Sequence, residues 1–203
     1  MSALLDVQKL EAFYGAGQVL HGIGLSIARG EQVALLGRNG MGKTTLLRSL
    51  MGLVADRRGQ ITLNGRAIMR AAPETIARAG VALVPEGRGV FGSLSVVENL
   101  VMAARPGIDG RKVWTLERIY DLFPRLHARR TNGGHQLSGG EQQMLTIGRA
   151  LMTNPDLILI DEATEGLAPL VAKDIWNTLG VIRSEGVATV VVDKDFRALS
   201  RIA

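Results

Sequence analysis

The chain has 203 residues, of which 46% are hydrophobic, so it can form one large domain or two interleaved subdomains around a sizeable core. It contains no cysteine, which excludes disulfides, thiolate metal sites and cysteine catalysis. The formal net charge is +5, but the arginines are scattered and only 4% of residues are aromatic. We therefore favour a basic solvated surface over a nucleic-acid-binding face and expect no nucleic-acid partner.

Neither a signal peptide nor a membrane span is expected. The first residues lack a basic segment and a long apolar stretch. The longest apolar runs, such as residues 187–192, are far shorter than the ~20 residues that a transmembrane helix needs. We therefore expect a soluble protein that is still able to dock on a membrane protein.

The first third of the chain predicts strands of two kinds. Residues 4–9 and 60–64 alternate between apolar and polar side chains, which is typical of half-exposed antiparallel strands, and Asn64-Gly65 is a hairpin signal. Residues 20–27 form an uneven strand pattern that two glycines interrupt. Turns are expected at 12–17 and at 56–59.

A glycine-rich stretch with the pattern G-x-x-x-x-G-K-[ST] stands between an expected buried strand at 33–36 and an expected helix at 46–51. Glycines let backbone N–H groups turn toward a phosphate, and the helix N-terminus adds the positive end of its dipole. In this interpretation Lys43 reaches the β- and γ-phosphates, and the Thr44 hydroxyl ligates Mg²⁺. The alternative is a turn that carries a lysine by chance. The predicted nucleotide-binding residues of this loop are Gly37, Arg38, Asn39, Gly40, Met41, Gly42, Lys43, Thr44 and Thr45.

The middle of the chain changes from mixed to helical character. A short helix at 73–78 begins with proline, and residues 81–84 form a buried strand. Ser95 and Glu98 have capping-box spacing and open a helix that runs to Ala104. Apolar residues recur with helical period over 111–123. We therefore expect a helical insert between two strands.

The next expected helix starts with two glycines. Ser138 and Glu141 stand at capping-box spacing, which predicts Ser138 as the N-cap. Gly139 and Gly140 each cost about 1 kcal/mol in a helix, so we expect them to serve a close approach, such as backbone N–H groups that meet a phosphate. An ordinary flexible helix start is the alternative.

The run at 157–160 predicts a buried strand that ends in Asp161 and Glu162. Ligands bind at the carboxyl ends of strands in open parallel sheets. We expect one carboxylate to hold Mg²⁺ and the next to orient water, against the alternative of two acids that cap a turn. A helix over 168–184 and a last buried strand at 187–192 complete the chain.

These motifs together resemble the ATPase subunit of an ATP-binding cassette transporter. The phosphate loop, the Leu137-Ser138-Gly139-Gly140-Glu141-Gln142-Gln143 element and the strand ending at Glu162 occur in the order typical of that superfamily. The resemblance covers the whole chain. It implies a single α/β domain with a P-loop NTPase (RecA-like) core and a mostly parallel sheet. An N-terminal antiparallel β subdomain and a helical insert subdomain complete it. The implied boundaries are 1–86 and 155–203 for the core with the antiparallel subdomain, and 87–154 for the helical subdomain with the signature element.

The resemblance also assigns roles by position. Tyr14 matches the aromatic residue that stacks on adenine, and Glu86 stands where most members have a glutamine that contacts Mg²⁺. Glu162 matches the general base, and Asp161 the magnesium carboxylate. The signature residues Leu137, Ser138, Gly139, Gly140 and Glu141 would contact the ATP of a partner subunit. ATP and Mg²⁺ are therefore the expected cofactors, with Thr44, Asp161 and Glu86 as the expected metal ligands.

Three positions depart from the family pattern. Lys194 stands at the switch position where the family usually has histidine, so we assign it to the catalytic set as a point charge for the γ-phosphate. Glu86 replaces a neutral glutamine, a change that the resemblance implies is shared by the branched-chain amino-acid importer subunits. The chain also stops at Ala203, and we expect it to lack the usual C-terminal end of such subunits.

Segments at 84–91, 122–126 and 166–170 resemble one of the two ATP-binding subunits of bacterial branched-chain amino-acid importers. The resemblance implies a second ATPase subunit, permease subunits whose coupling helix docks near Arg88 and Phe91, and indirectly a periplasmic binding protein. It places the protein in the cytoplasm, on the inner face of the plasma membrane. The alternatives are a urea or short-amide importer, a slow or degenerate site because of Lys194, and a non-transport cassette.

Overall fold

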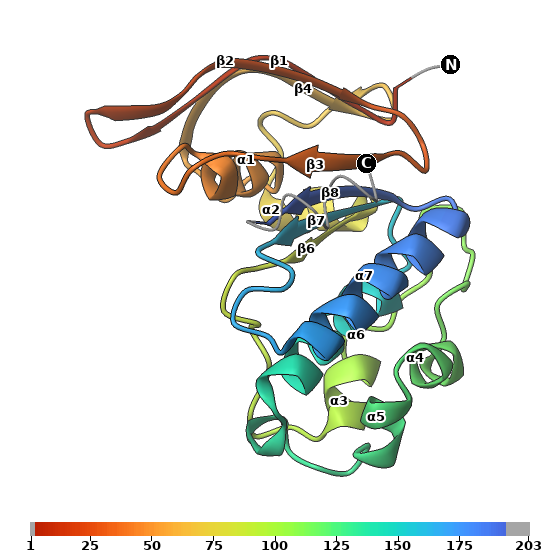
Figure 1. Cartoon of the computed structure of the whole chain (residues 1–203). Coiled ribbons are helices and arrows are strands. Elements are labelled where there is room, and N and C mark those ends of the chain that lie inside the picture. The colour runs from red at the N-terminus through yellow and green to blue at the C-terminus, as the bar shows by residue number, and fades with distance from the viewer. Residues whose placement is uncertain (1–2, 194–203) are drawn as a thin grey trace.

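The structure is a computed structural model and describes residues 3–193. Four antiparallel strands form a first sheet in the order β2-β1-β4-β5, at the top of Figure 1. Its strands are β1 (Leu5–Tyr14), β2 (Gly17–Ile27), β4 (Asp56–Leu63) and β5 (Arg66–Ala67). The predicted Asn64-Gly65 hairpin is confirmed, because both residues have positive φ and Leu63 pairs with Arg66.

The strands of this sheet are longer than predicted. The turn expected over 12–17 is wrong in part, because β1 continues to Tyr14 and pairs there with Gly17. The turn expected at 56–59 is wrong, since β4 already begins at Asp56. Gly59 bends the strand instead of ending it: its φ is +113°, and a Cβ there would collide with the Lys9 carbonyl. The pairing register of β1 and β4 shifts at this point, which is the behaviour of a β-bulge.

A second sheet of four parallel strands has the order β3-β8-β7-β6. Its strands are β3 (Gln32–Leu35), β6 (Val81–Val84), β7 (Leu157–Asp161) and β8 (Ala188–Val192). The expected continuous apolar strands are confirmed here: every residue of β7 and β8 is buried. Such burial on both faces requires a covering layer on each side.

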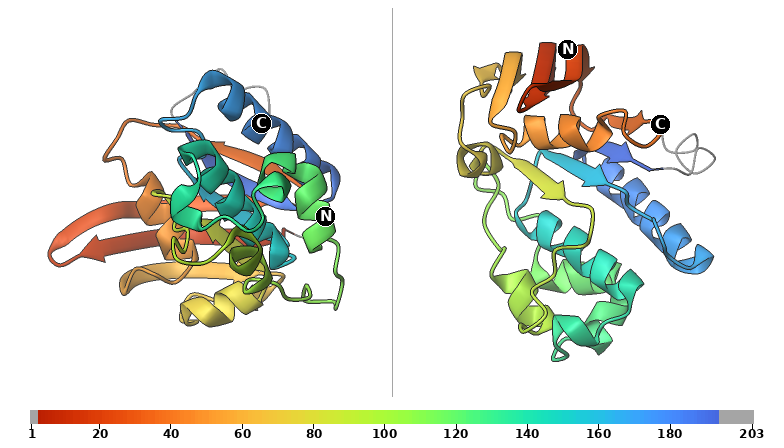
Figure 2. Two further views of the ribbon diagram at one scale, coloured as in Figure 1. Left: turned by 90° about the horizontal axis from the view of Figure 1, so that it is seen from below. Right: turned by 90° about the vertical axis from the view of Figure 1, so that its left-hand side faces the viewer.

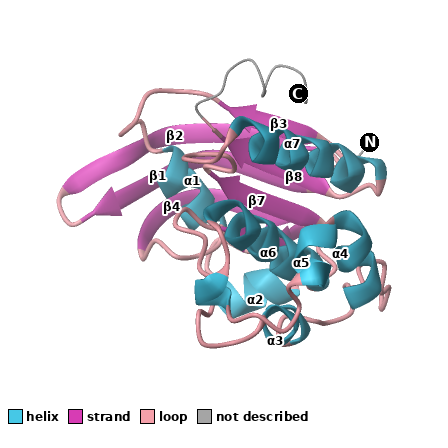
Figure 3. Cartoon of the chain, turned by 60° about the horizontal axis from the view of Figure 1, so that its bottom comes forward, coloured by secondary structure: helices cyan, strands magenta, loops and turns pink. Residues whose placement is uncertain are grey.

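Alternate residues of β7 and β8 enter two different cores. Leu157 and Leu159 face a core that includes the antiparallel sheet and α1 (Lys43–Leu50). Ile158 and Ile160 face a core formed with the later helices. Helix α1 thus lies between the two sheets, as the right-hand view of Figure 2 shows, and α6 and α7 lie across the opposite face of the parallel sheet (Figure 3). The structure confirms the α/β class with one antiparallel and one parallel sheet.

Five helices lie in the chain between β6 and β7. They are α3 (Val96–Val101), α4 (Leu116–Leu122), α5 (Pro124–Ala128), the short 3₁₀ helix η1 (Gly134–Gln136) and α6 (Gly139–Met152). Helix α2 (Pro73–Arg78) precedes β6, and α7 (Pro169–Ser184) lies between β7 and β8. The capping box at Ser95 is confirmed: its hydroxyl accepts from the Glu98 N–H, and Glu98 Oε2 accepts from the Ser95 N–H at 2.7 Å.

Two predicted helices are too long. Helix α3 ends at Val101 rather than at Ala104. The helix expected over 111–123 starts only after its N-cap, Thr115, because the Trp114 N–H donates to Asn154 Oδ1 at 2.8 Å. This tertiary bond holds the chain before α4 against the loop that leads into β7. The apolar spacing over 111–115 therefore reflects burial of an extended segment.

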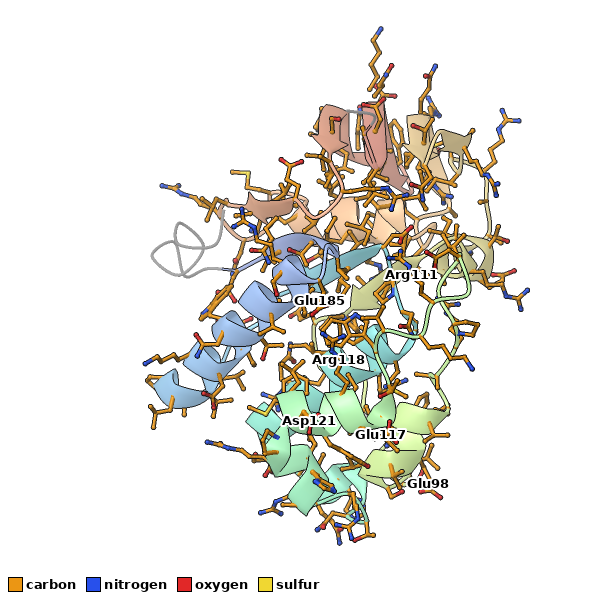
Figure 4. The ribbon with its side chains drawn as sticks, turned by 90° about the vertical axis from the view of Figure 1, so that its right-hand side faces the viewer. Glu98, Arg111, Glu117, Arg118, Asp121 and Glu185 are labelled. Carbon is orange, nitrogen blue, oxygen red and sulfur yellow. The ribbon has the colours of Figure 1, made fainter. Side chains whose placement is uncertain are left out.

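Helix α4 also contacts the end of α7. Figure 4 shows Arg118 and Glu185 pointing toward one another, and their side chains form an ion pair. The Arg118 guanidinium lies 4.7 Å from the centre of the Trp114 ring, which adds a cation–π contact. Among residues 3–193, no helix is both long enough and apolar enough to cross a bilayer.

Candidate functional site

The predicted phosphate loop connects β3 to α1 and is built on glycine geometry. Gly40 and Gly42 have φ of +80° and +84°. At Gly42 a Cβ would also lie 2.9 Å from Leu20 Cδ2 and 3.2 Å from Val19 Cγ1, so both the backbone conformation and the close packing favour glycine here. Gly42 caps α1 without a side-chain hydrogen bond, and the first turn has no acidic residue. The first N–H groups of the helix are thus available to an anion.

The ammonium group of Lys43 is held over this loop. Its Nζ donates to the Gly37 carbonyl at 2.7 Å and to the Arg38 carbonyl at 2.9 Å. These bonds fix the charge beside the N-terminus of α1, where both favour a phosphate group.

A pocket of about 340 Å³ opens above the loop. Most of the predicted loop residues line it, and so do the predicted acidic residues Glu86 and Glu162. Three further lining residues, Val19, Glu165 and Val192, were not predicted from the sequence. Val19 and Val192 come from β2 and from the end of β8, and no local pattern marks such positions.

Asp161 is the last residue of β7 and lies beneath the loop. It is only 3% exposed, and burial raises the pKa of its carboxyl, against the effects of a hydrogen bond from Thr44 and of the Lys43 and Arg48 charges. Its Oδ1 has no hydrogen-bond partner. A buried, unpartnered carboxylate oxygen beside a threonine hydroxyl fits a hard divalent cation such as Mg²⁺.

Glu162 follows Asp161 directly and lies just beyond the end of β7. Its φ is +52°, a left-handed backbone conformation that residues other than glycine rarely adopt. Its N–H donates to the Val192 carbonyl at 2.9 Å, which anchors the residue to β8. The expectation of two adjacent strand residues is therefore wrong, because strand geometry positions Asp161 and a strained turn positions Glu162.

Three carboxylates gather at the mouth of the pocket. Single oxygen atoms of Glu86, Glu162 and Glu165 lie within 4.8 Å of one another. Glu86 and Glu165 are exposed, whereas Glu162 is half-buried. The predicted metal ligand Glu86 thus shares a cluster with the predicted general base.

The segment after Glu162 is tied to the end of β8. The Asp193 carboxylate accepts from the Thr164 N–H at 2.9 Å and from the Thr164 hydroxyl at 2.8 Å. Lys194, the predicted switch residue, lies outside the described residues.

The predicted signature element forms the start of α6, and Ser138 is its N-cap as predicted. The capping box is complete: the Ser138 hydroxyl accepts from the Glu141 N–H, and Glu141 Oε2 accepts from the Ser138 N–H at 2.8 Å. Glu141 also pairs with Arg129 at 2.9 Å. Leu137 precedes the cap and is buried. The serine and the first turn are therefore held rigidly.

The two glycines of this turn have neighbours within the chain. A Cβ on Gly140 would lie 2.5 Å from Val171 Cγ1 of α7, and a Cβ on Gly139 would lie 2.7 Å from the Arg88 guanidinium. Arg88 is a long side chain that moves at little cost, whereas Val171 is fixed at the start of a helix. The expectation that both glycines serve only a phosphate is thus too narrow, because packing against α7 already requires Gly140.

Gly140→Ala is expected to destabilise the fold by about 1–3 kcal/mol, because the added methyl group overpacks the contact with Val171. Thermal denaturation measures the loss, and Val171→Ala on the same chain should restore most of it. Gly180→Ala in α7 is the matched control, since a Cβ there meets nothing within 4 Å. The control should stabilise by about 0.5–1 kcal/mol. Equal effects of the two glycine variants would contradict this packing.

The structure does not bring every predicted site residue to one place. None of the signature residues 137–141 is among the described residues that line the phosphate pocket. Tyr14 is 50% exposed at the end of β1 and is also absent from the lining. The phosphate loop, Asp161 and Glu162 thus form one cluster, and the signature turn forms a separate surface of the same chain.

Comparisons with known proteins identify the family of the chain. A family model described as "ABC transporter" matches residues 20–165. The chain is 38% identical over 200 residues to the high-affinity branched-chain amino acid transport ATP-binding protein BraG of Pseudomonas aeruginosa, covering 98% of this chain and 86% of BraG. It is 36% identical to the lipopolysaccharide export system ATP-binding protein LptB of Acidithiobacillus ferridurans, covering 97% and 82%.

Solved structures show the same fold. One that is described as the ATP-binding subunit of an ABC transporter superposes with a TM-score of 0.82 at 30% identity. The match covers 98% of this chain and 83% of that one. The fold of this chain thus recurs in that ATP-binding subunit.

Proposed function

Since the chain belongs to the ABC transporter family of ATPases, we propose that it hydrolyses ATP to drive uptake of branched-chain amino acids or related small solutes through a membrane permease. The observation that carries the hydrolytic part is the convergence at one pocket. A glycine-built anion cradle comes from residues 37–45, and its Thr44 contacts Asp161, whose buried Oδ1 has no partner. The strained Glu162, next to Asp161 at the end of β7, lines the same pocket as the cradle.

Different residues of the chain have different roles in hydrolysis. The α1 N-terminus and Lys43 hold the β- and γ-phosphates and offset their charge. Thr44, Asp161 and Glu86 would hold Mg²⁺, which neutralises charge that develops on the phosphate oxygens. Glu162 accepts a proton from the attacking water, and its anchored backbone keeps the carboxylate in place.

The second wall of the site comes from another subunit. The signature turn has a rigid cap and bare glycine N–H groups, yet it lies away from the phosphate pocket of its own chain. We propose that Ser138, Gly139 and Gly140 contact the γ-phosphate bound by a second copy, or by a related ATPase subunit, and that closure of the pair assembles the site. Tyr14 would stack on the adenine ring.

The permease would dock in a groove of about 330 Å³ between α2, β6, α6 and the segment that follows α3. Arg88 and Arg149 line this groove, and the Arg149 guanidinium stacks over the Phe91 ring at 4.5 Å. Phe91 is 44% exposed. An exposed aromatic ring backed by a cation beside an apolar groove is the kind of surface that anchors a short amphipathic helix.

The importer assignment and the solute follow from similarity. BraG is named for branched-chain amino acid transport, and LptB for lipopolysaccharide export. The chain is slightly more similar to BraG, and we therefore propose an importer at the inner face of a bacterial plasma membrane, with a periplasmic binding protein as an indirect partner.

Uptake by a reconstituted transporter tests this function. Vesicles that contain the chain and its permease should accumulate leucine, isoleucine or valine when ATP is present. Phe91→Asp should abolish uptake and leave the ATPase rate of the isolated chain unchanged. Val181→Asp is the matched control, since Val181 is 40% exposed on α7, outside the groove lining, and should leave uptake intact. If the vesicles accumulate only urea or short amides, these become the assigned solutes in place of branched-chain amino acids. Transport out of the vesicles would contradict the importer assignment.

A further inference from the structure

A smaller pocket of about 270 Å³ adjoins the phosphate site. It shares with that site the carboxylates of Glu86, Glu162 and Glu165. Its other walls come from the loop after β6 and from Gln142 and Gln143 of α6. The pocket thus lies where the helix that begins with the signature turn meets the loop that carries Glu162.

Gln143 is the unusual residue in this pocket. It is only 4% exposed, and its Nε2 has no hydrogen-bond partner among the described residues. An unsatisfied buried amide donor costs about 1–3 kcal/mol, whereas an apolar side chain of the same length would cost nothing. This residue therefore destabilises the protein unless an acceptor reaches it in another state.

The neighbouring glutamine behaves differently. Gln142 Nε2 donates to the Gly134 carbonyl at 3.1 Å, and its Oε1 accepts from Arg88 Nη1 at 3.4 Å. Both ends of Gln142 are thus used to fix α6 against the surrounding loops. Of the two glutamines, Gln143 is the one whose amide donor is unused within the described residues, and the carboxylates of the pocket are acceptors.

We propose that Gln143 is a positioning residue for Glu162, and that its Nε2 donates to the Glu162 carboxylate when the site closes around nucleotide. Glu162 is favoured over the other two because it is half-buried and anchored to β8, whereas Glu86 and Glu165 are exposed and solvated. This inference rests on the proposed ATPase function. It adds a contact by which α6 sets the orientation of the catalytic carboxylate of its own chain.

The contact has a physical purpose. Three carboxylates within 4.8 Å repel one another, and a bond from the Gln143 amide would favour one orientation of the Glu162 side chain, toward the attacking water. A donor on α6 ties this orientation to the position of the helix. Closure of the signature turn on a partner's nucleotide and alignment of Glu162 would then occur together.

Gln143→Met tests the proposal, because methionine keeps the length and the burial but removes the donor. We expect kcat for ATP hydrolysis to fall about 10-fold, the worth of one hydrogen bond to a charged group, with KM for ATP unchanged. The melting temperature should stay the same or rise. Gln142→Met should show the opposite pattern, with a lower melting temperature and a smaller effect on kcat. A Gln143→Met protein with wild-type kcat, or with a melting temperature lowered as much as that of Gln142→Met, would overturn the proposal.

A double-mutant cycle on the full chain identifies the partner. Adding Gln143→Met to Glu162→Ala should cause no further loss in single-turnover hydrolysis, whereas adding it to Glu165→Ala should still cost about 10-fold. Full additivity with Glu162→Ala would overturn the assignment. If the wild-type chain hydrolyses ATP and depends on Glu162, the proposed function stands whatever the outcome of this cycle.

Discussion

Glu162→Gln is expected to lower kcat for ATP hydrolysis by about 100-fold or more, because the amide cannot accept the proton of the attacking water. The side chain keeps its size, and the backbone bond to Val192 is unaffected, so ATP should still bind. With hydrolysis blocked, an ATP-bound pair of subunits should accumulate. Phosphate release measures the first effect, and sedimentation in ATP and Mg²⁺ measures the second.

Glu165→Gln is the matched control for that variant. Glu165 lies in the same carboxylate cluster and lines the same pocket, but it is exposed. We expect its replacement to change kcat by no more than a few-fold. A Glu162→Gln protein with an unchanged hydrolysis rate would remove Glu162 from the mechanism.

Asp161→Asn is expected to lower the rate of ATP hydrolysis and to raise the stability of the fold. Hydrolysis should fall about 100-fold, the size of effect seen when a catalytic charge or metal-site group is removed. In the absence of divalent cations the variant should melt at a higher temperature than the wild type, because a buried carboxylate without a partner for Oδ1 is replaced by a neutral group. Each 1 kcal/mol regained corresponds to about 2–4 °C in a chain of this size.

The stability difference should also depend on pH. Burial raises the pKa of Asp161, so the folded state holds its proton more tightly than the unfolded chain does. Wild-type stability therefore declines as the pH rises from the unfolded value, about 3.9, through the raised pKa. The advantage of Asp161→Asn should be greatest at neutral pH and vanish in acid.

The same replacement at Asp156, an aspartate outside the site, should not stabilise the protein. The Asp156 carboxylate lies 3.6 Å from Arg29 and accepts from Asn64 at 3.3 Å. Asp156→Asn should therefore leave stability equal or lower and hydrolysis unchanged. A stabilising effect of the same size in both variants would show that general charge removal, rather than the metal site, explains the result.

The sequence predicted the parts of the molecule that local pattern determines. Continuous apolar runs identified β6, β7 and β8, and glycine and capping chemistry identified the phosphate loop and the start of α6. These features depend on residues close together in the chain, so spacing alone reveals them.

The errors arise where tertiary contacts override local pattern. The segment before α4 has helical spacing, but the bond from Trp114 to Asn154 holds it extended. Gly59 looks like a turn residue and instead makes a bulge inside β4. Val19 and Val192 reach the pocket through sheet pairing, and the requirement for Gly140 comes from Val171 on another helix. The sequence next to these residues contains no pattern that predicts such long-range contacts.

A mixture of two inactive variants tests the composite site most directly. Lys43→Ala disables the phosphate loop and keeps the signature turn, whereas Ser138→Arg disables the turn and keeps the loop. Mixed pairs would hold one intact site, so a 1:1 mixture should recover about a quarter of the wild-type ATPase rate, although each variant alone is inactive. A mixture of folded proteins no more active than its components would contradict a site shared between two copies of this chain.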